Sequence, residues 1–303
     1  MCGITGILFK GPGRVGPVGR IQVQMLQALH RRGPDSTGVA LYGPPQGGYL
    51  LRARTRPNGA DGEARVERAR AAIEAMATVR ELAPTPAGVT ATLTYEGELA
   101  ALADGVEAAE ETLDVLSLGR SMQIVKEVGS AEELDRAYGI SSFVGGHAIG
   151  HTRMATESRV DTLHSHPFWA RPFADIALVH NGHVTNEHKW RRRLEQRGHR
   201  FLTDNDSEVV AAYLADQLER GEDLDEVLER SVRELDGSFS YLVSTADGIG
   251  FARDQFGLKP LLLAETDEYV VLASEDIAIR AAFADDDIRP REVGAGEARS
   301  WQR

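Results

Sequence analysis

The apolar residues of this chain recur with two different periods, which predict strands toward both ends and helices between them. Residues 3–9 and 39–42 are short apolar runs that predict buried strands, while the apolar positions between Ile21 and Leu29 follow helical spacing. Toward the other end, four runs bounded by Gly, Asp and Pro predict an antiparallel series of strands. These runs are 239–244, 250–253, 260–264 and 269–273.

Between these ends, the pattern from His147 onward predicts alternating strands and helices. Residues 147–153 and 175–181 read as strands, and residues 187–197 and 207–219 read as helices. Strands at both ends with amphipathic helices between them favour sheets covered by helices, which is an α+β architecture.

Residues from about 51 to 145 differ in character from the rest of the chain. We expect helices over 65–80 and 122–138 and a strand over 89–95, with an acidic, Ala-rich stretch at 98–111. Because no motif with evident chemistry lies in this segment, we interpret it as an insertion that packs on a core or meets a partner.

Composition narrows the class of protein. The 303 residues carry a formal net charge of −12, which argues against a general nucleic-acid-binding surface. A single cysteine excludes an internal disulfide framework and fits a reducing cytoplasm. No run approaches the roughly 18 uninterrupted apolar residues of a membrane span, and no basic region precedes the first residues as in a signal peptide. We therefore expect a cytoplasmic protein with no membrane or nucleic-acid partner.

That single cysteine, Cys2, directly follows the initiator methionine. Trimming Met1 would leave a residue with both a thiol and a free α-amine, whose reference pKa values are about 8.5 and about 7.7–8.0. The amine can take the proton as the sulfur attacks, so the residue carries its own base.

Four further segments contain residue types that suit catalysis, although each also has a structural interpretation. Arg-Gly-x-Asp can form a turn closed by a salt bridge, His-Asn-Gly can form a tight turn after a strand, and Asp before an apolar helix can be an N-cap. The segments are Arg32–Gly38, His151–Thr156, His180–Gly182 with His166–Pro167 upstream, and Asp204–Glu208.

Taken with Cys2, the order of these segments resembles the class II glutamine amidotransferases, a branch of the N-terminal-nucleophile hydrolases. The later Arg253-Asp254-x-x-Gly257-x-Lys259-Pro260 also fits that family. The resemblance implies one amidotransferase domain over residues 2–303, interrupted by the insertion at about 51–145. Its expected fold is a four-layer αββα sandwich of two antiparallel sheets between helical layers.

The sequence is more closely similar to the stand-alone amidotransferase subunits of glutamate-synthase-like complexes, such as N-methylglutamate synthase. Met154, within His-Thr-Arg-Met-Ala-Thr-Glu-Ser, and the long insertion ending at Ile149-Gly150 carry this similarity. It implies hetero-oligomerisation with a flavin-containing synthase subunit and a further small subunit. We expect no cofactor in this chain, with FMN and an iron–sulfur cluster on the partner.

The resemblance also implies a role for each matching residue in hydrolysis of L-glutamine to glutamate and ammonia. Cys2 would attack the amide carbon, and the Asn181 side chain with the Gly182 backbone N–H would stabilise the oxyanion. The remaining matches would bind substrate or line its pocket. They are Arg153 for the carboxylate with Thr156 as helper, Asp206 for the ammonium, Arg32 near the nucleophile and His166 in the pocket wall.

Other interpretations stay open at this stage. His151 and His180 suggest a metal site, but no matching carboxylate accompanies them, so we expect none; strand alternation would turn His180 away from Asn181. The chain is alternatively a free-standing N-terminal-nucleophile amidohydrolase acting on a γ-glutamyl or other amide. A third interpretation is a catalytically silent regulatory subunit that keeps the fold.

Overall fold

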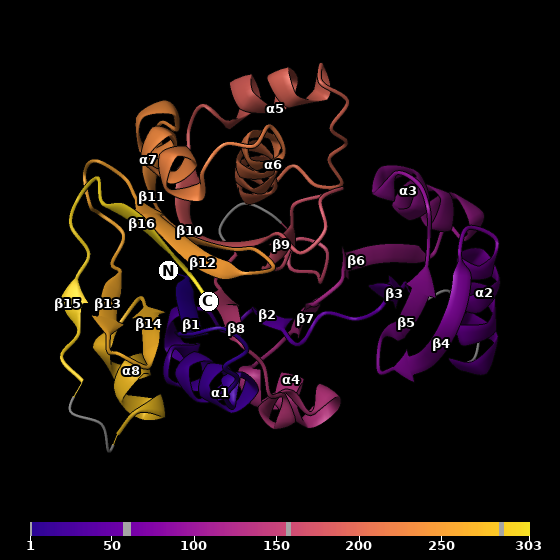
Figure 1. Cartoon of the computed structure of the whole chain (residues 1–303), viewed down its shortest axis with the longest axis horizontal. Coiled ribbons are helices and arrows are strands. Elements are labelled where there is room, and N and C mark those ends of the chain that lie inside the picture. The colour runs from indigo at the N-terminus through magenta and orange to yellow at the C-terminus, as the bar shows by residue number, and fades with distance from the viewer. Residues whose placement is uncertain (1, 57–61, 156–158, 285–287) are drawn as a thin grey trace.

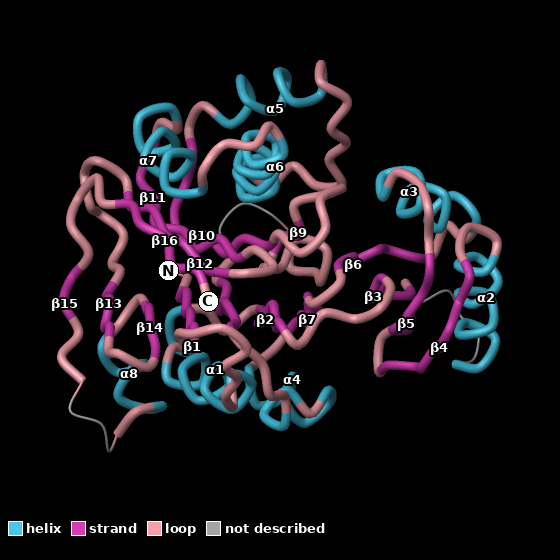
Figure 2. The backbone as a smooth tube through the Cα atoms, in the orientation of Figure 1, coloured by secondary structure: helices cyan, strands magenta, loops and turns pink. Residues whose placement is uncertain are grey.

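The strands of this protein form three antiparallel sheets, two of which lie face to face with helices on their outer sides (Figures 1 and 2). The structure, a computed structural model, describes residues 2–56, 62–155, 159–284 and 288–303. In Figure 1 the four layers of the sandwich stack from top to bottom, and the third sheet lies to one side. The expected αββα sandwich is confirmed.

The first sheet has seven strands in the order β15–β13–β14–β1–β8–β2–β7. Their bounds are β1 Gly3–Phe9, β2 Ser36–Tyr42, β7 Met122–Val128, β8 His147–Arg153, β13 Leu262–Glu265, β14 Tyr269–Ala273 and β15 Arg291–Glu292. Its outer face is covered by α1 (Val18–Ala28), α4 (Ala131–Tyr138) and α8 (Asp276–Ala282). Alternation along β1 explains this packing, because Ile7 faces the helices while Ile4 and Leu8 face the second sheet.

The second sheet has five strands in the order β16–β12–β11–β10–β9. Their bounds are β9 Phe168–Trp169, β10 Ala177–Val184, β11 Gly237–Ser244, β12 Gly248–Arg253 and β16 Ala298–Gln302. Its outer face is covered by α5 (Glu187–Glu195), α6 (Asp206–Glu219) and α7 (Leu224–Glu234). Buried side chains such as Val179, Leu242 and Phe251 face the first sheet, so the two sheets share one apolar core.

The third sheet, in the order β4–β5–β3–β6, belongs to the segment that interrupts the sandwich. Its strands are β3 Tyr49–Thr55, β4 Thr78–Thr85, β5 Gly88–Thr94 and β6 Leu113–Gly119, and α2 (Gly62–Glu74) and α3 (Leu99–Ala109) pack on it. Within the range of about 51–145 that we interpreted as inserted, β7 and α4 instead lie in the sandwich. Sheet membership therefore limits the separate segment to residues 49–119.

Two expected helices are wrong in extent. The predicted helix over 122–138 is instead β7, which pairs with β2 from Ser36↔Val128 to Tyr42↔Met122, followed by α4. The true start of α4 is marked by a capping box between Ser130 and Glu133, which the uniform helical interpretation overlooked. The predicted helix over 65–80 ends at Glu74, because Thr78 already begins β4.

One buried carboxylate and one buried guanidinium attach the inserted segment to the sandwich. The Asp175 carboxylate accepts backbone N–H groups of Arg120, Ser121 and Met122 at 2.8–2.9 Å, where β6 leads into β7. The Arg171 guanidinium, from the loop after β9, donates to Asp104 and Glu107 of α3. Since both groups are less than a tenth exposed, the segment is held firmly against the sandwich.

None of the helices in the described part of the chain has the length and apolar content needed to span a bilayer.

Candidate active site

Cys2 lies immediately before β1 and lines a pocket of about 460 Å³ at one end of the sandwich. Its thiol lies 3.7 Å from the backbone oxygen of Met154. Burial raises the pKa of the Cys2 thiol, although the Met154 carbonyl contact and nearby positive charge act in the other direction. The thiol is therefore protonated at neutral pH and requires a base before it can act as a nucleophile.

The backbone around Cys2 is fixed by close contacts on both sides. The Arg32 Nε donates to the Cys2 carbonyl at 2.9 Å, and the same guanidinium forms an ion pair with Glu275. Next to Cys2, a Cβ on Gly3 would lie 2.8 Å from the Thr152 hydroxyl oxygen, so only glycine fits. Arg32 thus contacts the main chain of Cys2 and is not among the residues that line the pocket.

Asn181 and Gly182 lie near the end of β10, on the opposite sheet. Asn181 is 3% exposed, and within the described residues its Nδ2 has no hydrogen-bond partner. By strand alternation, Asn181 points from the same face of β10 as Val179, which meets the first sheet. The strand β1 of that first sheet directly follows Cys2. Gly182 lines the pocket with φ of +148°, and a Cβ there would lie 2.2 Å from the Ser238 carbonyl oxygen.

Asp206 supplies a partly buried carboxylate to the pocket from the first turn of α6. Its Oδ2 accepts the Val184 backbone N–H at 2.9 Å, and its Oδ1 accepts the Ser207 hydroxyl at 3.1 Å. The Nδ1 atoms of His180 and His183 each lie 3.6 Å away. Burial alone would raise the pKa of Asp206, but the adjacent His180 and these hydrogen bonds outweigh it and lower the pKa to about 2.

Arg153 ends β8 and lines the same pocket. It is 4% exposed, and its Nη1 donates to the Arg159 backbone oxygen at 2.8 Å. The Asp35 carboxylate accepts the Ala155 N–H at 2.7 Å, so the chain after Arg153 is held by the Arg32–Gly38 motif. Thr156 lies outside the described residues.

His166 lines the pocket and stacks on His151, with ring centroids 4.1 Å apart. The backbone of His180 connects them, since its N–H donates to His166 Nδ1 at 3.3 Å and its carbonyl accepts from His151 Nε2 at 3.0 Å. Burial lowers the pKa of His166 well below its usual range and that of His151 to about 3. Both rings are therefore neutral at physiological pH.

Sequence reasoning assigned His180 only a structural role, but the structure also gives it a place in the pocket wall. As expected from alternation, it faces α6 and not the side of Asn181, and its Nδ1 lies 2.8 Å from the Ser207 hydroxyl. The signal for this contact was available, because Ser207 belongs to the Asp204–Glu208 segment already singled out. Within the described residues, no three His, Cys, Asp or Glu side chains gather as a metal would require.

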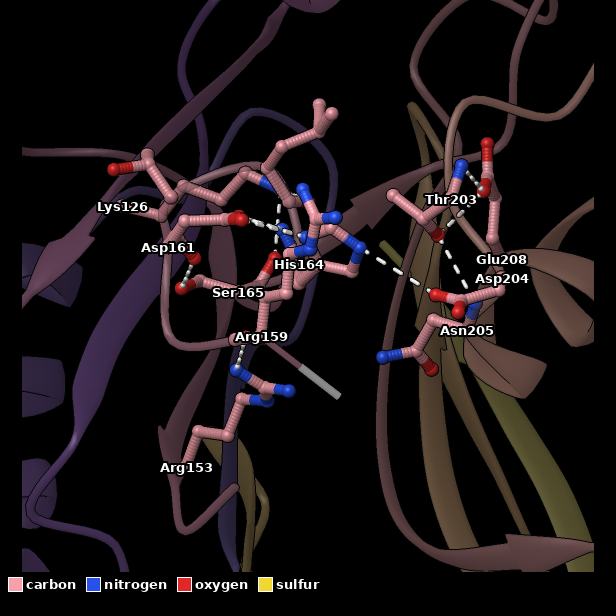
Figure 3. A network of polar contacts seen from close by, with 12 residues as sticks. Lys126, Arg153, Arg159, Asp161, His164, Ser165, Thr203, Asp204, Asn205 and Glu208 are labelled. Carbon is pink, nitrogen blue, oxygen red and sulfur yellow. Dashed lines mark hydrogen bonds and ion pairs between the residues drawn. The ribbon is translucent and has the colours of Figure 1, made fainter. Parts of the chain in front are cut away.

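A second contact that sequence reasoning missed connects two loop segments beside the pocket. His164 Nε2 lies 3.5 Å from Asp204 Oδ1, while its Nδ1 bonds to Asp161 at 2.8 Å (Figure 3). This contact joins the segment after β8 to the segment before α6, both of which contribute residues to the pocket. No periodicity or motif marks His164, so no sequence signal identified it.

Comparison with known proteins fits this fold and pocket. A family model for the glutamine amidotransferase domain matches residues 151–281. The chain is 37% identical to a provisionally assigned glutamine amidotransferase of Methanothermobacter thermautotrophicus, covering 100% of both chains. It is 36% identical to the glutamine amidotransferase-like protein GlxB of Rhizobium meliloti, covering 91% of this chain and 89% of that protein.

The fold also matches a solved structure of glutamine phosphoribosylpyrophosphate amidotransferase from B. subtilis, with a TM-score of 0.60 at 20% identity. The match covers 99% of this chain but 49% of that enzyme, so the chain spans about half its length. This chain therefore belongs to the class II glutamine amidotransferases, with the N-terminal-nucleophile hydrolase fold. The proteins from M. thermautotrophicus and R. meliloti are two relatives of similar length.

The neutral buried state of His151 predicts a specific dependence of stability on pH. Its pKa is about 3 when folded and about 6.5 in the unfolded chain, so the unfolded chain binds one more proton between these values. Stability is then fully present above about pH 6.5 and falls with decreasing pH, by about 1.4 kcal/mol per pH unit from this group. In His151→Gln, the free energy of unfolding measured with denaturant should fall less steeply between pH 6 and pH 4 than in the wild type.

The matched control is His30→Gln, which replaces an exposed histidine outside the pocket. Equal pH slopes for wild type, His151→Gln and His30→Gln would contradict the neutral buried assignment.

Proposed function

We propose that this chain is a glutaminase subunit that hydrolyses L-glutamine to glutamate and ammonia through Cys2. The observation that carries the proposal is one pocket lined by a thiol, a buried guanidinium and a partly buried carboxylate, those of Cys2, Arg153 and Asp206. These groups complement the amide, carboxylate and ammonium of glutamine, respectively. Membership of the amidotransferase family supports glutamine as the substrate.

In the proposed reaction, removal of Met1 frees the α-amine of Cys2. The amine accepts the thiol proton as the sulfur bonds to the side-chain amide carbon, and the C=O electron pair moves to the oxygen. When the oxyanion collapses, the α-ammonium of Cys2 gives its proton to the amide nitrogen, and ammonia leaves. Water, deprotonated by the same amine, then attacks the thioester, releasing glutamate and restoring the thiol.

The oxyanion would be stabilised by Asn181 Nδ2 and the Gly182 backbone N–H. Support for this role comes from the burial of Asn181 with no partner for Nδ2 among the residues that the structure describes, since an unpaired buried donor normally costs stability. A donor kept unpaired at rest is suited to a charge that develops only during reaction. Gly182 supports the same role by bringing bare backbone to the pocket wall.

The far end of glutamine would be bound by charge pairing. Asp206, ionised at neutral pH, suits the substrate ammonium, and Arg153 suits the carboxylate, with Thr156 assisting. Arg32 would support the Cys2 backbone through its bond to the carbonyl, and His166 would form part of the wall.

We further propose that the ammonia passes to a separate glutamate-synthase-like subunit, of which N-methylglutamate synthase is one example. That partner would carry FMN and an iron–sulfur cluster and bind with a further small subunit. Phe256 and Leu258, after β12, are 72% and 70% exposed, which is typical of a contact surface. The expected result of native affinity purification is a hetero-oligomer containing a flavoprotein. Purification of this chain alone would exclude that partner.

Covalent labelling tests the catalytic proposal directly. Incubation with a diazo-ketone analogue of glutamine should add one adduct to a protein that has lost Met1, because the analogue alkylates a nucleophile in the glutamine pocket. Intact mass and peptide mapping should place the adduct on Cys2, and Cys2→Ala should be unlabelled and release no ammonia.

Two other results identify the alternatives. Faster release of the amine from γ-glutamyl amides than of ammonia from glutamine would indicate an amidohydrolase with a different substrate. A mature chain that neither labels nor hydrolyses glutamine, even with its copurifying proteins, would indicate a silent regulatory subunit.

The assignment of Asp206 to the substrate ammonium predicts a selective loss in Asp206→Asn. The amide keeps one oxygen for the Val184 N–H but loses the charge, so kcat/KM for glutamine should fall by about 10–100-fold. Glutaric acid monoamide, which lacks the α-amine, serves as the matched control substrate. Its kcat/KM should change little, and equal losses on both substrates would count against this role.

A further inference from the structure

Lys126 is a buried ammonium group in the apolar core of the sandwich. It lies on β7, on the same face as Met122 and Ile124, which pack between the two sheets. Lys126 is only 4% exposed. Burial lowers its pKa to about 7, with Glu208 and Asp161 acting in the other direction. A charge is retained at such a position only when its hydrogen bonds are satisfied.

The ammonium is satisfied by three backbone carbonyls from one short segment. Lys126 Nζ donates to Ser165 O at 2.7 Å, to Pro167 O at 3.1 Å and to Leu163 O at 3.3 Å. An ammonium has three donors, so each proton has one acceptor. Figure 3 shows Lys126 beside Asp161 and Ser165 in this network.

The segment 163–167 that Lys126 binds carries His166 into the pocket wall. It also passes directly over β2, because a Cβ on Gly38 would lie 2.2 Å from the His166 carbonyl oxygen and 2.6 Å from the Lys126 Cβ. Gly38 therefore leaves the space in which the segment and the lysine stem lie together. From its other side, the same segment reaches Asp204 through His164.

We propose that Lys126 is a positioning residue of the glutamine pocket, whose ammonium holds the backbone of residues 163–167 and thereby sets the place of His166 and His164. This inference rests on the proposed function for its catalytic consequence, but not for the anchoring itself. Arginine would not reproduce the contact, since a planar fork does not match three carbonyls that converge on one nitrogen. The inserted segment leads directly into β7, the strand that carries Lys126, so the attachment of that segment also affects the position of Lys126 and of the pocket wall.

The primary test compares Lys126→Met with Ile124→Ala. Methionine fills the space without a charge and leaves three buried carbonyls without their donor. Ile124 lies two residues away on the same face of β7 and belongs to the apolar core, so its truncation controls for a loss of core packing on this strand. We expect kcat/KM for glutamine to fall by about 10–100-fold in Lys126→Met and to stay near wild type in Ile124→Ala.

Amide hydrogen exchange of residues 163–166 provides a readout independent of catalysis. Exchange should accelerate by about 10-fold or more in Lys126→Met relative to Ile124→Ala, after correction for global stability. Equal exchange and equal kcat/KM in the two variants would overturn the proposal. Should Lys126→Met not fold, Lys126→Arg is compared with Ile124→Ala in the same way, and wild-type exchange and kcat/KM in Lys126→Arg would overturn it.

The outcome is separable from the catalytic proposal. If wild type is neither labelled nor active, the proposed function fails, while the exchange comparison still decides whether Lys126 anchors the segment. If wild type and Lys126→Met both label at Cys2 but Lys126→Met alone loses kcat/KM and exchange protection, both proposals stand.

Discussion

The face-to-face packing of two antiparallel sheets is the constraint on which the pocket depends. Cys2 precedes the first strand of one sheet, whereas Asn181 and Gly182 lie at the end of a strand in the other, nearly 180 residues later. Only the shared core between the sheets brings these groups to one end of the molecule. The backbone of His180, bonded to His151 from β8 and to His166, reinforces this alignment with directed contacts where apolar packing ends.

The chemistry of the pocket separates groups that must stay charged from groups that must stay neutral. Asp206 remains ionised because His180, the Val184 N–H and the Ser207 hydroxyl stabilise its charge by more than burial disfavours it. The imidazoles of His151 and His166 remain neutral because burial disfavours their charged form and the nearby Arg153 acts in the same direction. Arg153 supplies positive charge in this pocket that is suited to bind a carboxylate.

Sequence patterns predicted the layered architecture well, because alternation and helical spacing report directly on which face of an element is buried. Short motifs likewise identified residues that the fold gathers in one pocket, among them Cys2, Arg153, His166, Gly182 and Asp206. The failures have physical causes. Residues 122–138 contain both a strand and a capped helix, and the charged Lys126 obscured the alternation of β7. Contacts such as His164 with Asp204 depend on loop geometry that leaves no periodic trace.

The core of the inserted segment is continuous with the core of the sandwich, and this has a consequence for modularity. Leu51, Val89 and Leu102 belong to the same buried cluster as Ile4 and Phe251. Splicing residue 48 directly to residue 120 would therefore expose apolar surface of β7 and β9 that the segment covers, and would remove Asp104 and Glu107, the partners of the buried Arg171. Residues 49–119 cannot be treated as a detachable accessory: a minimal version of this protein would require a redesigned edge of the sandwich at β7 and β9.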